Sequence, residues 1–291
     1  MTLSSFQSML PLIPAMSNEV ISAGFALAAA VCWGGSDFSG GVSAKGTNAM
    51  SVVIVGQVAG LLCLLALLFM TGEPAPSFAT LLWGCGAGLG AGFGLVYFYQ
   101  ALAIGQMGIN APITCIVTSV FTVLFGIWLE GMPAPLQIGG FALAMIAIWL
   151  MTSSEGKTAG LRQAVYAGLG FSVYLICSKQ AANEAVYWPL VVSRITSILT
   201  LLAVVTASGG FVKPVADRSY MLAAGILDAA ANALFIYAVR HGRLDVATML
   251  SGLYPAVTAL CARFILHEQV SRRQGVGIAV ALTAVLLIAA H

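Results

Sequence analysis

The sequence predicts an all-α integral membrane protein with ten transmembrane helices. Of its 291 residues 60% are apolar and only 8% are charged, whereas about 25% of residues are charged in a soluble domain. Twelve basic and ten acidic side chains are too few to cover a soluble fold, but a bilayer makes such a cover unnecessary. The apolar residues also fall into successive runs of about 20 residues, the length that crosses a bilayer as a helix.

Turn residues and charges separate these runs, as at Gly72-Glu73-Pro74 and Arg272-Arg273. The predicted helices cover residues 20–42, 48–70, 78–103, 110–129, 135–152, 162–182, 188–207, 219–239, 244–266 and 274–290.

A polar break at residues 153–158 lies near the middle of the chain and suggests a duplication. A shift of the sequence by about 137 positions pairs Gln137 with Gln274 and Gly140 with Gly277. Each half then has an odd number of helices, so the second half enters the membrane from the opposite side. We therefore predict two inverted-topology five-helix repeats around a central cavity. The predicted units are a short N-terminal segment (1–19), a first repeat (20–154) and a second repeat (159–291).

Asp228 is the strongest candidate for a functional residue, because it lies about halfway along the predicted helix 219–239. A charged Asp at the bilayer centre costs about 2.5–3.5 kcal/mol. Asn232 follows one turn later and projects from the same face. Asp228 either binds substrate or a coupling proton, or is a protonated carboxyl hydrogen-bonded between helices.

Asp37 is the second candidate and shares a helix face with Trp33, four residues earlier. A carboxylate beside an aromatic wall suits a cationic or zwitterionic ligand, although Asp37 could also lie close enough to the interface to be solvated. The shift pairs Asp37 with Tyr174 and Asp228 with Ala91. The acids are not duplicated, so the cavity is expected to be chemically asymmetric.

Arg194, about two turns into its helix, could balance either acid, bind a substrate carboxylate, or extend to the interface. Tyr99, Gln100 and Tyr254 either line the cavity or belong to an interfacial aromatic belt. Pro255 frees a backbone carbonyl in a spanning helix and could act as a gating hinge.

No enzyme is expected from the motifs. The chain has no HExxH pair and no GxxxxGK[ST] segment, and its six cysteines and three histidines are scattered. We predict no cofactor and no metal site, and the net charge of +2 indicates no nucleic-acid partner.

Several segments resemble the EamA family of the drug/metabolite transporter superfamily. Tyr254-Pro255 leads to Leu266-His267-Glu268, and a glycine-led helix follows from Gly275. Cys32-Trp33-Gly34-Gly35 is similar to the family's Trp-Gly motif. The first half departs from the pattern, since Val117-Thr118 replaces the Tyr-Pro pair. The resemblance implies ten helices in two inverted halves, and an exporter of metabolites, amino acids or drugs.

The expected function is a secondary transporter for small organic metabolites in the cell (inner or plasma) membrane, by alternating access, with proton coupling possible. The alternatives are a flippase for lipid-linked substrates and a non-transporting scaffold or assembly protein. The scaffold predicts no polar cavity and both acids salt-bridged and dry. Expected partners are the substrate and membrane lipid, with the chain a monomer or a homodimer.

Two indications of orientation disagree. Seven basic residues in the loops on one side against three on the other put both termini outside by the positive-inside rule. The family resemblance implies both termini in the cytoplasm.

Overall fold

A computed structural model describes residues 18–130, 135–152, 159–181, 185–207, 218–241, 250–269 and 271–289. Within these ranges the chain is helical, without strands. The predicted N-terminal segment 1–19 lies almost entirely outside the described residues.

The helix bounds agree closely with those predicted from the apolar runs. The helices are α2 (Asn18–Gly46), α3 (Ala49–Thr71), α4 (Phe78–Ile104), α5 (Met107–Glu130), α6 (Pro135–Thr152), α7 (Leu161–Ala181), α8 (Tyr187–Ala207), α9 (Arg218–His241), α11 (Tyr254–Ile265) and α12 (Arg272–Ala289).

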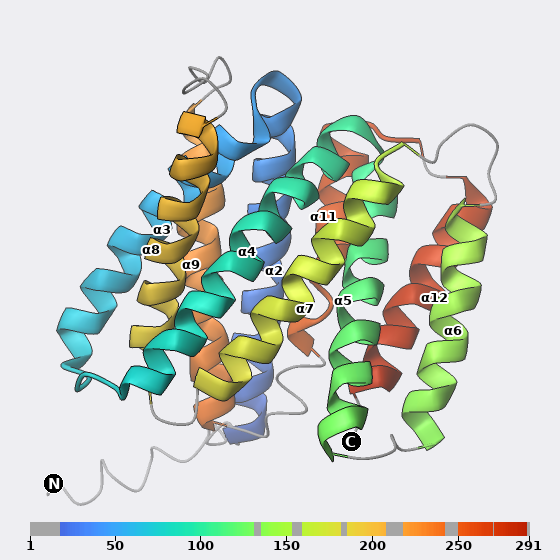
Figure 1. Cartoon of the computed structure of the whole chain (residues 1–291). Helices are drawn as coiled ribbons and strands as arrows, with labels where there is room; N and C mark the ends of the chain where they lie inside the picture. The colour runs from blue at the N-terminus through green and yellow to red at the C-terminus, as the bar shows by residue number, and fades with distance from the viewer. Residues whose placement is uncertain are drawn as a thin grey trace, which may run out of the picture.

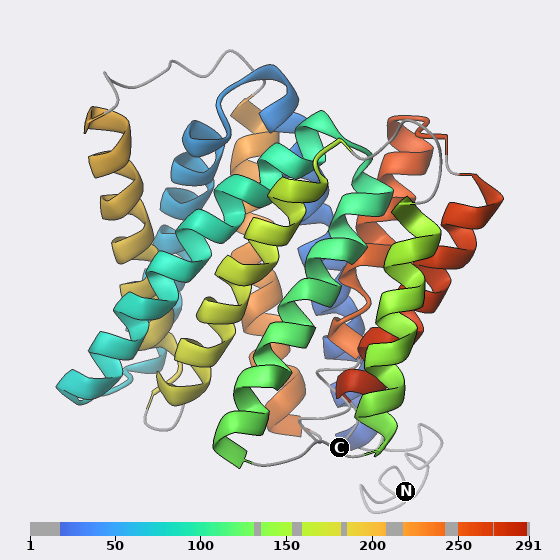
Figure 2. The same cartoon turned by 45° about the vertical axis from the view of Figure 1, so that its right-hand side comes forward.

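Successive helices run in alternating directions through one bundle (Figure 1). Helix α2 begins and α12 ends at the same face of the bundle, and α7 runs opposite to α2 in both views (Figures 1 and 2). The most extensive packing joins α4 to α7 and α2 to α9. The predicted repeat makes α7 the counterpart of α2, and α9 the counterpart of α4. The contact between α4 and α7 then corresponds to the contact between α9 and α2, as a two-fold relation requires. The inverted repeat itself stays a prediction.

The chain is a multi-pass membrane protein. Five helices among the described residues are long and apolar enough to cross a membrane, and large apolar side chains such as Phe69, Met70 and Phe78 are exposed on the outside of the bundle. The count of ten membrane-spanning helices stays a prediction. The five spans are Val20–Gly46, Ala49–Thr71, Phe78–Ile104, Tyr187–Ala207 and Arg218–Ala238.

Glycines on two opposite faces of α4 let it pack closely between α7 and α8. A Cβ on Gly88 would lie 2.5 Å from the Ser193 carbonyl oxygen of α8. A Cβ on Gly90 would lie 2.6 Å from the Tyr174 amide nitrogen of α7. Because residues two apart lie on opposite sides of a helix, alternate glycines serve the two neighbours. The α8-facing set is Gly84, Gly88 and Gly92, and the α7-facing set is Gly86, Gly90 and Gly94.

The predicted continuous helix 244–266 is wrong in one respect. Its described part is interrupted by a turn at Gly252 and Leu253, and α11 starts anew at Tyr254 with Pro255 in its first turn. Proline lacks an N–H group and suits the first turn of a helix, where that group has no partner within the helix. Pro255 therefore begins a helix here, instead of kinking the interior of one.

His267 closes α11 in the left-handed conformation, with φ of 52°. Glycine adopts this backbone conformation without steric cost, whereas a residue with a Cβ atom adopts it at a cost. The turn thus has a backbone conformation that glycine would adopt more easily than the histidine found there.

Candidate functional site

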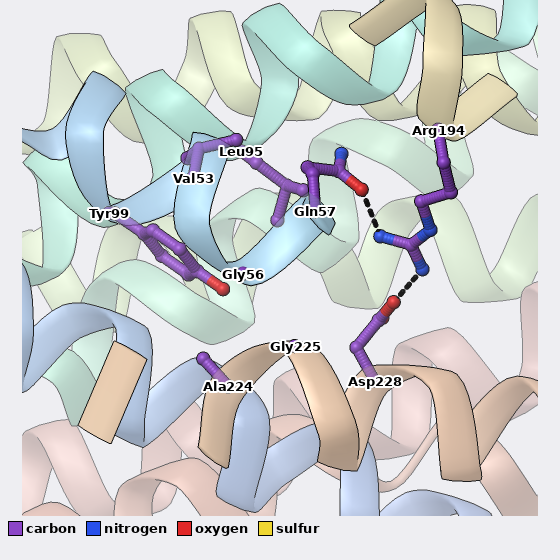
Figure 3. Close-up of a pocket in the computed structure, with 9 residues that line it drawn as sticks. All are labelled: Val53, Gly56, Gln57, Leu95, Tyr99, Arg194, Ala224, Gly225 and Asp228. Atoms are coloured by element: carbon purple, nitrogen blue, oxygen red, sulfur yellow. Dashed lines mark hydrogen bonds and ion pairs between the residues drawn. The ribbon is translucent and has the colours of Figure 1, made fainter. Parts of the chain in front are cut away.

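An ion pair and an amide form a polar cluster in the middle of the bundle. Arg194 of α8 donates to the Asp228 carboxylate of α9 and to the Gln57 side-chain carbonyl of α3 (Figure 3). Only 11% of the Arg194 side chain and 24% of the Asp228 side chain are exposed. The pair therefore neutralises two charges that would be costly in lipid. The sequence left open whether Arg194 balances an acid, binds substrate or extends to the interface. In the structure it balances Asp228.

Two further hydrogen bonds hold this cluster. The Gln57 amide donates to the Ser197 hydroxyl at 3.1 Å. The Asn232 amide donates to the Asp228 carbonyl at 2.7 Å and to its carboxylate at 3.3 Å. Asp228 and Asn232 thus share a face, as their spacing predicted.

Sequence reasoning missed Gln57. Its helix is the most apolar of the candidate spans, and from Val52 to Met70 Gln57 is its one amide, acidic or basic residue. A lone amide in such a span is an expensive group that needs a partner, and this signal could have identified it.

Close packing of α3 against α9 brings the polar groups together. A Cβ on Gly225 would lie 2.1 Å from the Gly56 carbonyl oxygen, so only glycine fits at position 225. A Cβ on Gly60 would lie 3.7 Å from the Arg194 guanidinium carbon. Gln57 and Asp228 flank the crossing, which therefore sets the position of both Arg194 partners.

The space beside the cluster is small. Tyr99 of α4 points its hydroxyl into a cavity lined by Gln57, Arg194 and Asp228 (Figure 3). The cavity volume is about 10 Å³, about the space for one water molecule. Sites for small organic ligands are usually about 300–1,000 Å³. This conformation is therefore closed around the cluster.

Asp37 also interacts with Tyr99 but has a different environment. Its side chain is partly exposed, and it interacts electrostatically with Tyr99, Cys115 and Tyr254. Among the described residues no hydrogen bond or ion pair engages its carboxylate. Asp37 is thus an acid near groups of α4, α5 and α11 without a neutralising cation among them.

Glycines of α2 let these neighbours approach Asp37. A Cβ on Gly34 would lie 2.8 Å from the Tyr254 carbonyl oxygen, and a Cβ on Gly40 would lie 2.1 Å from the Tyr99 ring. The Thr258 hydroxyl donates to the Gly34 carbonyl at 3.3 Å. The glycines flanking Asp37 therefore serve close helix packing.

Trp33 and Tyr254 form an aromatic group beside this acid. Their ring centroids are 6.4 Å apart and nearly perpendicular, and Trp33 also packs against Phe235 at 5.7 Å. The group joins α2, α9 and the first turn of α11. It lies next to the interruption between Ser251 and Tyr254.

Like Asp37, Trp33, Asn232 and Tyr254, the candidates Tyr174 and Gln100 do not line the small cavity. Tyr174 of α7 is close enough to Arg194 to interact with it electrostatically. Gln100 is half-buried and does not line the cavity. The four polar side chains that line the cavity are Gln57, Tyr99, Arg194 and Asp228.

The scaffold alternative predicted that both acids would be salt-bridged and dry. Asp228 is ion-paired as that alternative expects, but Asp37 is partly exposed and has no such pair among the described residues. The two acids therefore differ in their availability to a ligand.

Residues that could hold a metal do not come together in the part of the chain that the structure describes. The six cysteines are free thiols distributed over the bundle.

Comparison with known proteins agrees with this architecture. Residues 158–290 match the model of the EamA-like transporter family. The second half of the chain is therefore similar to an EamA-like domain. The resemblance recognised in its Tyr254-Pro255 and Glu268 segments is thereby confirmed. The family suggests a membrane transporter of the drug/metabolite transporter superfamily. Val117-Thr118, where the first half departs from the EamA pattern, lies outside the matched residues.

Two similar proteins accompany this EamA match. The uncharacterized protein MJ1333.1 of Methanocaldococcus jannaschii is 25% identical over 130 residues, which are 44% of this chain and 92% of that protein. That relative is thus about half as long as this chain. A solved crystal structure, described only as that of a protein, aligns with a TM-score of 0.62 at 16% identity. The alignment covers 91% of this chain and 95% of the other, and it shows a shared fold alone.

Proposed function

We propose that this protein is a secondary transporter that exports small cationic or zwitterionic metabolites across the cell membrane. The observation that carries the proposal is the contrast between its two intramembrane acids. Asp228 is neutralised by Arg194, whereas Asp37 lies beside an aromatic group without a cation partner among the described residues. An acid held in this way needs a proton or a cationic ligand to be stable in the membrane.

The aromatic group gives Asp37 a chemical preference. Trp33 and Tyr254 offer π faces next to the carboxylate, and such faces attract organic cations. A protonated amine therefore suits this site, and a proton suits it when no amine is bound. Exchange between the two would couple export to a proton gradient.

Arg194 extends the preference to zwitterions. Two of its guanidinium nitrogens bind Gln57 and Asp228, and a guanidinium has five N–H donors. A substrate carboxylate could bind the remaining donors while its ammonium faces Asp37, with Tyr99 between them. Amino acids are one such class of substrate.

Alternating access between the two halves would open and close this site. The cavity of about 10 Å³ cannot hold such a substrate, so transport requires states that open it to either side. The exchange symmetry of the helix packing supports two related halves that rock about the centre.

The test measures the effect of Asp37 substitutions on transport in proteoliposomes. Cells that express the protein are first screened for resistance to toxic amino acids and organic cations, and the resulting compound is followed under an imposed pH gradient. We expect Asp37→Asn to abolish gradient-driven transport, and Asp37→Glu to retain part of it. Gradient-driven transport by Asp37→Asn at the wild-type rate would overturn the coupling role.

A second candidate, a flippase for lipid-linked substrates, is favoured by one observation. An open groove of about 410 Å³ between α4 and α7 is lined by apolar side chains and by Tyr97 and Tyr166. The Arg162 guanidinium lies 5.4 Å from the Tyr166 ring centroid. The groove could hold an acyl chain with an anionic head group near Arg162. Redistribution of a fluorescent anionic lipid between leaflets, lost in Val173→Trp, would support this candidate; its absence in wild-type proteoliposomes would exclude it.

A further inference from the structure

Glu73, in the turn between α3 and α4, holds the start of a helix from the other half. Its carboxylate accepts hydrogen bonds from the backbone N–H groups of Val186 at 2.7 Å, Tyr187 at 2.8 Å and Trp188 at 3.0 Å. The Trp188 indole also donates to the Glu73 carbonyl at 3.0 Å. The first N–H groups of a helix have no partner within it and carry a partial positive charge. Glu73 therefore binds the N-terminus of α8 strongly.

Glu268, in the turn between α11 and α12, makes the corresponding contact in the opposite sense. Its carboxylate accepts from the N–H groups of Met107 at 3.3 Å and Gly108 at 3.4 Å, at the start of α5. Lys45 at the end of α2 lies 3.8 Å away. Here a residue of the second half holds two helices of the first half.

These two contacts lie at opposite ends of the bundle. The turn between α3 and α4 is at the lower end in Figure 1, and the turn between α11 and α12 is at the upper end. Each contact joins one half of the chain to the other. Relative motion of the halves that opens one end must therefore separate the carboxylate from the helix start at that end.

We infer that Glu73 and Glu268 are two latches, one on each face of the membrane, that must release in turn for the site to open to that face. This inference rests on the proposed transport function. Both latches are engaged in the described structure, where the central cavity is closed to about 10 Å³. Among the described residues, the contacts at both ends are thus those expected of an occluded state.

The two latches differ in strength. Glu73 accepts three backbone hydrogen bonds of 3.0 Å or less, whereas Glu268 accepts two of 3.3 and 3.4 Å. Shorter charge-assisted bonds are stronger. The Glu268 face should therefore open more often in the wild-type protein.

Cys115 is a native reporter for opening. It is 6% exposed and interacts electrostatically with Asp37 and Tyr254 near the centre of the bundle. In a variant whose other five cysteines are replaced by alanine, a membrane-impermeant maleimide reaches Cys115 only through an open face. The reagent is added to one side or the other of oriented proteoliposomes.

We expect slow labelling in the wild type, faster from the Glu268 face than from the Glu73 face. Glu73→Gln should increase the labelling rate about tenfold from the Glu73 face alone, the change expected from the loss of one charge-assisted hydrogen bond. Glu268→Gln should increase it from the opposite face alone, by a smaller factor. Lys45→Gln should act on the same face as Glu268→Gln and less strongly, because Lys45 is partly solvent-exposed.

The inference would be overturned if both glutamate variants increased the Cys115 labelling rate from the same face, or from both faces equally. A general loss of stability would increase labelling from both faces. If Glu73→Gln is not recovered folded, Trp188→Phe removes only the indole donation and should give a smaller increase from the same face. Sided labelling without any transport would reject the proposed function alone. Transport with unsided labelling would reject the latches alone.

Discussion

Helices α4 and α9, which the predicted repeat would pair, differ in how they use their side chains. Helix α4 has no acidic or basic side chain, and its two glycine rows pack against α7 and α8. Helix α9 makes one glycine crossing, Gly225 on Gly56, and carries Asp228 and Asn232. The shift that relates the halves pairs Asp228 with Ala91. One half thus provides close packing where the other provides polar chemistry.

The helices also use different means to hold their neighbours. Along α9, the Ser36 and Ser22 hydroxyls of α2 donate to the carbonyls of Ala224 and Ala238 at 2.7 and 2.8 Å. Backbone contact through glycine dominates along α4. Close van der Waals packing and interhelical hydrogen bonds both stabilise helix association in lipid. The comparison teaches that two helices of one bundle can pack closely by different means, α4 through glycine and α9 through hydrogen bonds, while only α9 of the two carries an acid.

The largest effect should come from unpairing the charge on α9. Asp228→Ala leaves Arg194 without its carboxylate, and breaking a buried ion pair costs about 3–5 kcal/mol. We expect about 3 kcal/mol, since 24% of the Asp228 side chain is exposed. The free energy of unfolding in detergent measures the loss. The double variant Asp228→Ala with Arg194→Met should recover most of it, and equal losses in both variants would contradict the pairing.

The next largest effect should come from filling a glycine contact of α4. The Cβ of Gly90→Ala would meet backbone atoms of Tyr174 and Gly170 at 2.6 and 2.7 Å, and backbone cannot easily move aside. We expect a loss of about 1–3 kcal/mol, measured by the same unfolding assay.

Gly139→Ala in α6 is the matched control, because a Cβ there meets nothing within 4 Å. It should leave stability unchanged or raise it by up to about 1 kcal/mol, the helix propensity difference. Similar losses in the two variants would show that the α4 glycines are not required for close approach.

A smaller effect is expected at Gln57, the amide that supports Arg194. Gln57→Leu removes the acceptor of one Arg194 donor and the donor to Ser197. We expect a loss of about 1–2 kcal/mol. In a double-mutant cycle this loss should be non-additive with Arg194→Met; strict additivity would contradict the contact.

The smallest effect should be a gain at His267, which lies outside both helices. His267→Gly relieves the left-handed backbone at φ of 52° and should raise the free energy of unfolding by about 0.5–1 kcal/mol. The gain should add to the effect of Asp228→Ala, because the two sites share no contact. A loss of stability would show that the His267 side chain contributes more than its backbone costs.

The positions of the helices could be predicted from the sequence alone. Runs of apolar residues and the Gly, Pro and charged breaks between them act locally, because each spanning segment must satisfy its own backbone hydrogen bonds in lipid. The same energetic argument identified Asp37, Asp228 and Arg194 as groups that need a partner or a ligand. The local break before Pro255 was visible as a proline, although its effect was taken for a kink.

The partners of these groups were decided only by the tertiary structure. Helices that are apolar on all sides carry no periodic signal for the face that turns inward. The rotation of α3, α8 and α9 therefore could not be predicted, and neither could the contacts among Gln57, Arg194 and Asp228. Glu73 and Glu268 were visible only as turn residues, because their helix partners are far away in the chain. Local hydrophobicity determined where this chain crosses the membrane, and packing between distant helices decided which polar groups meet.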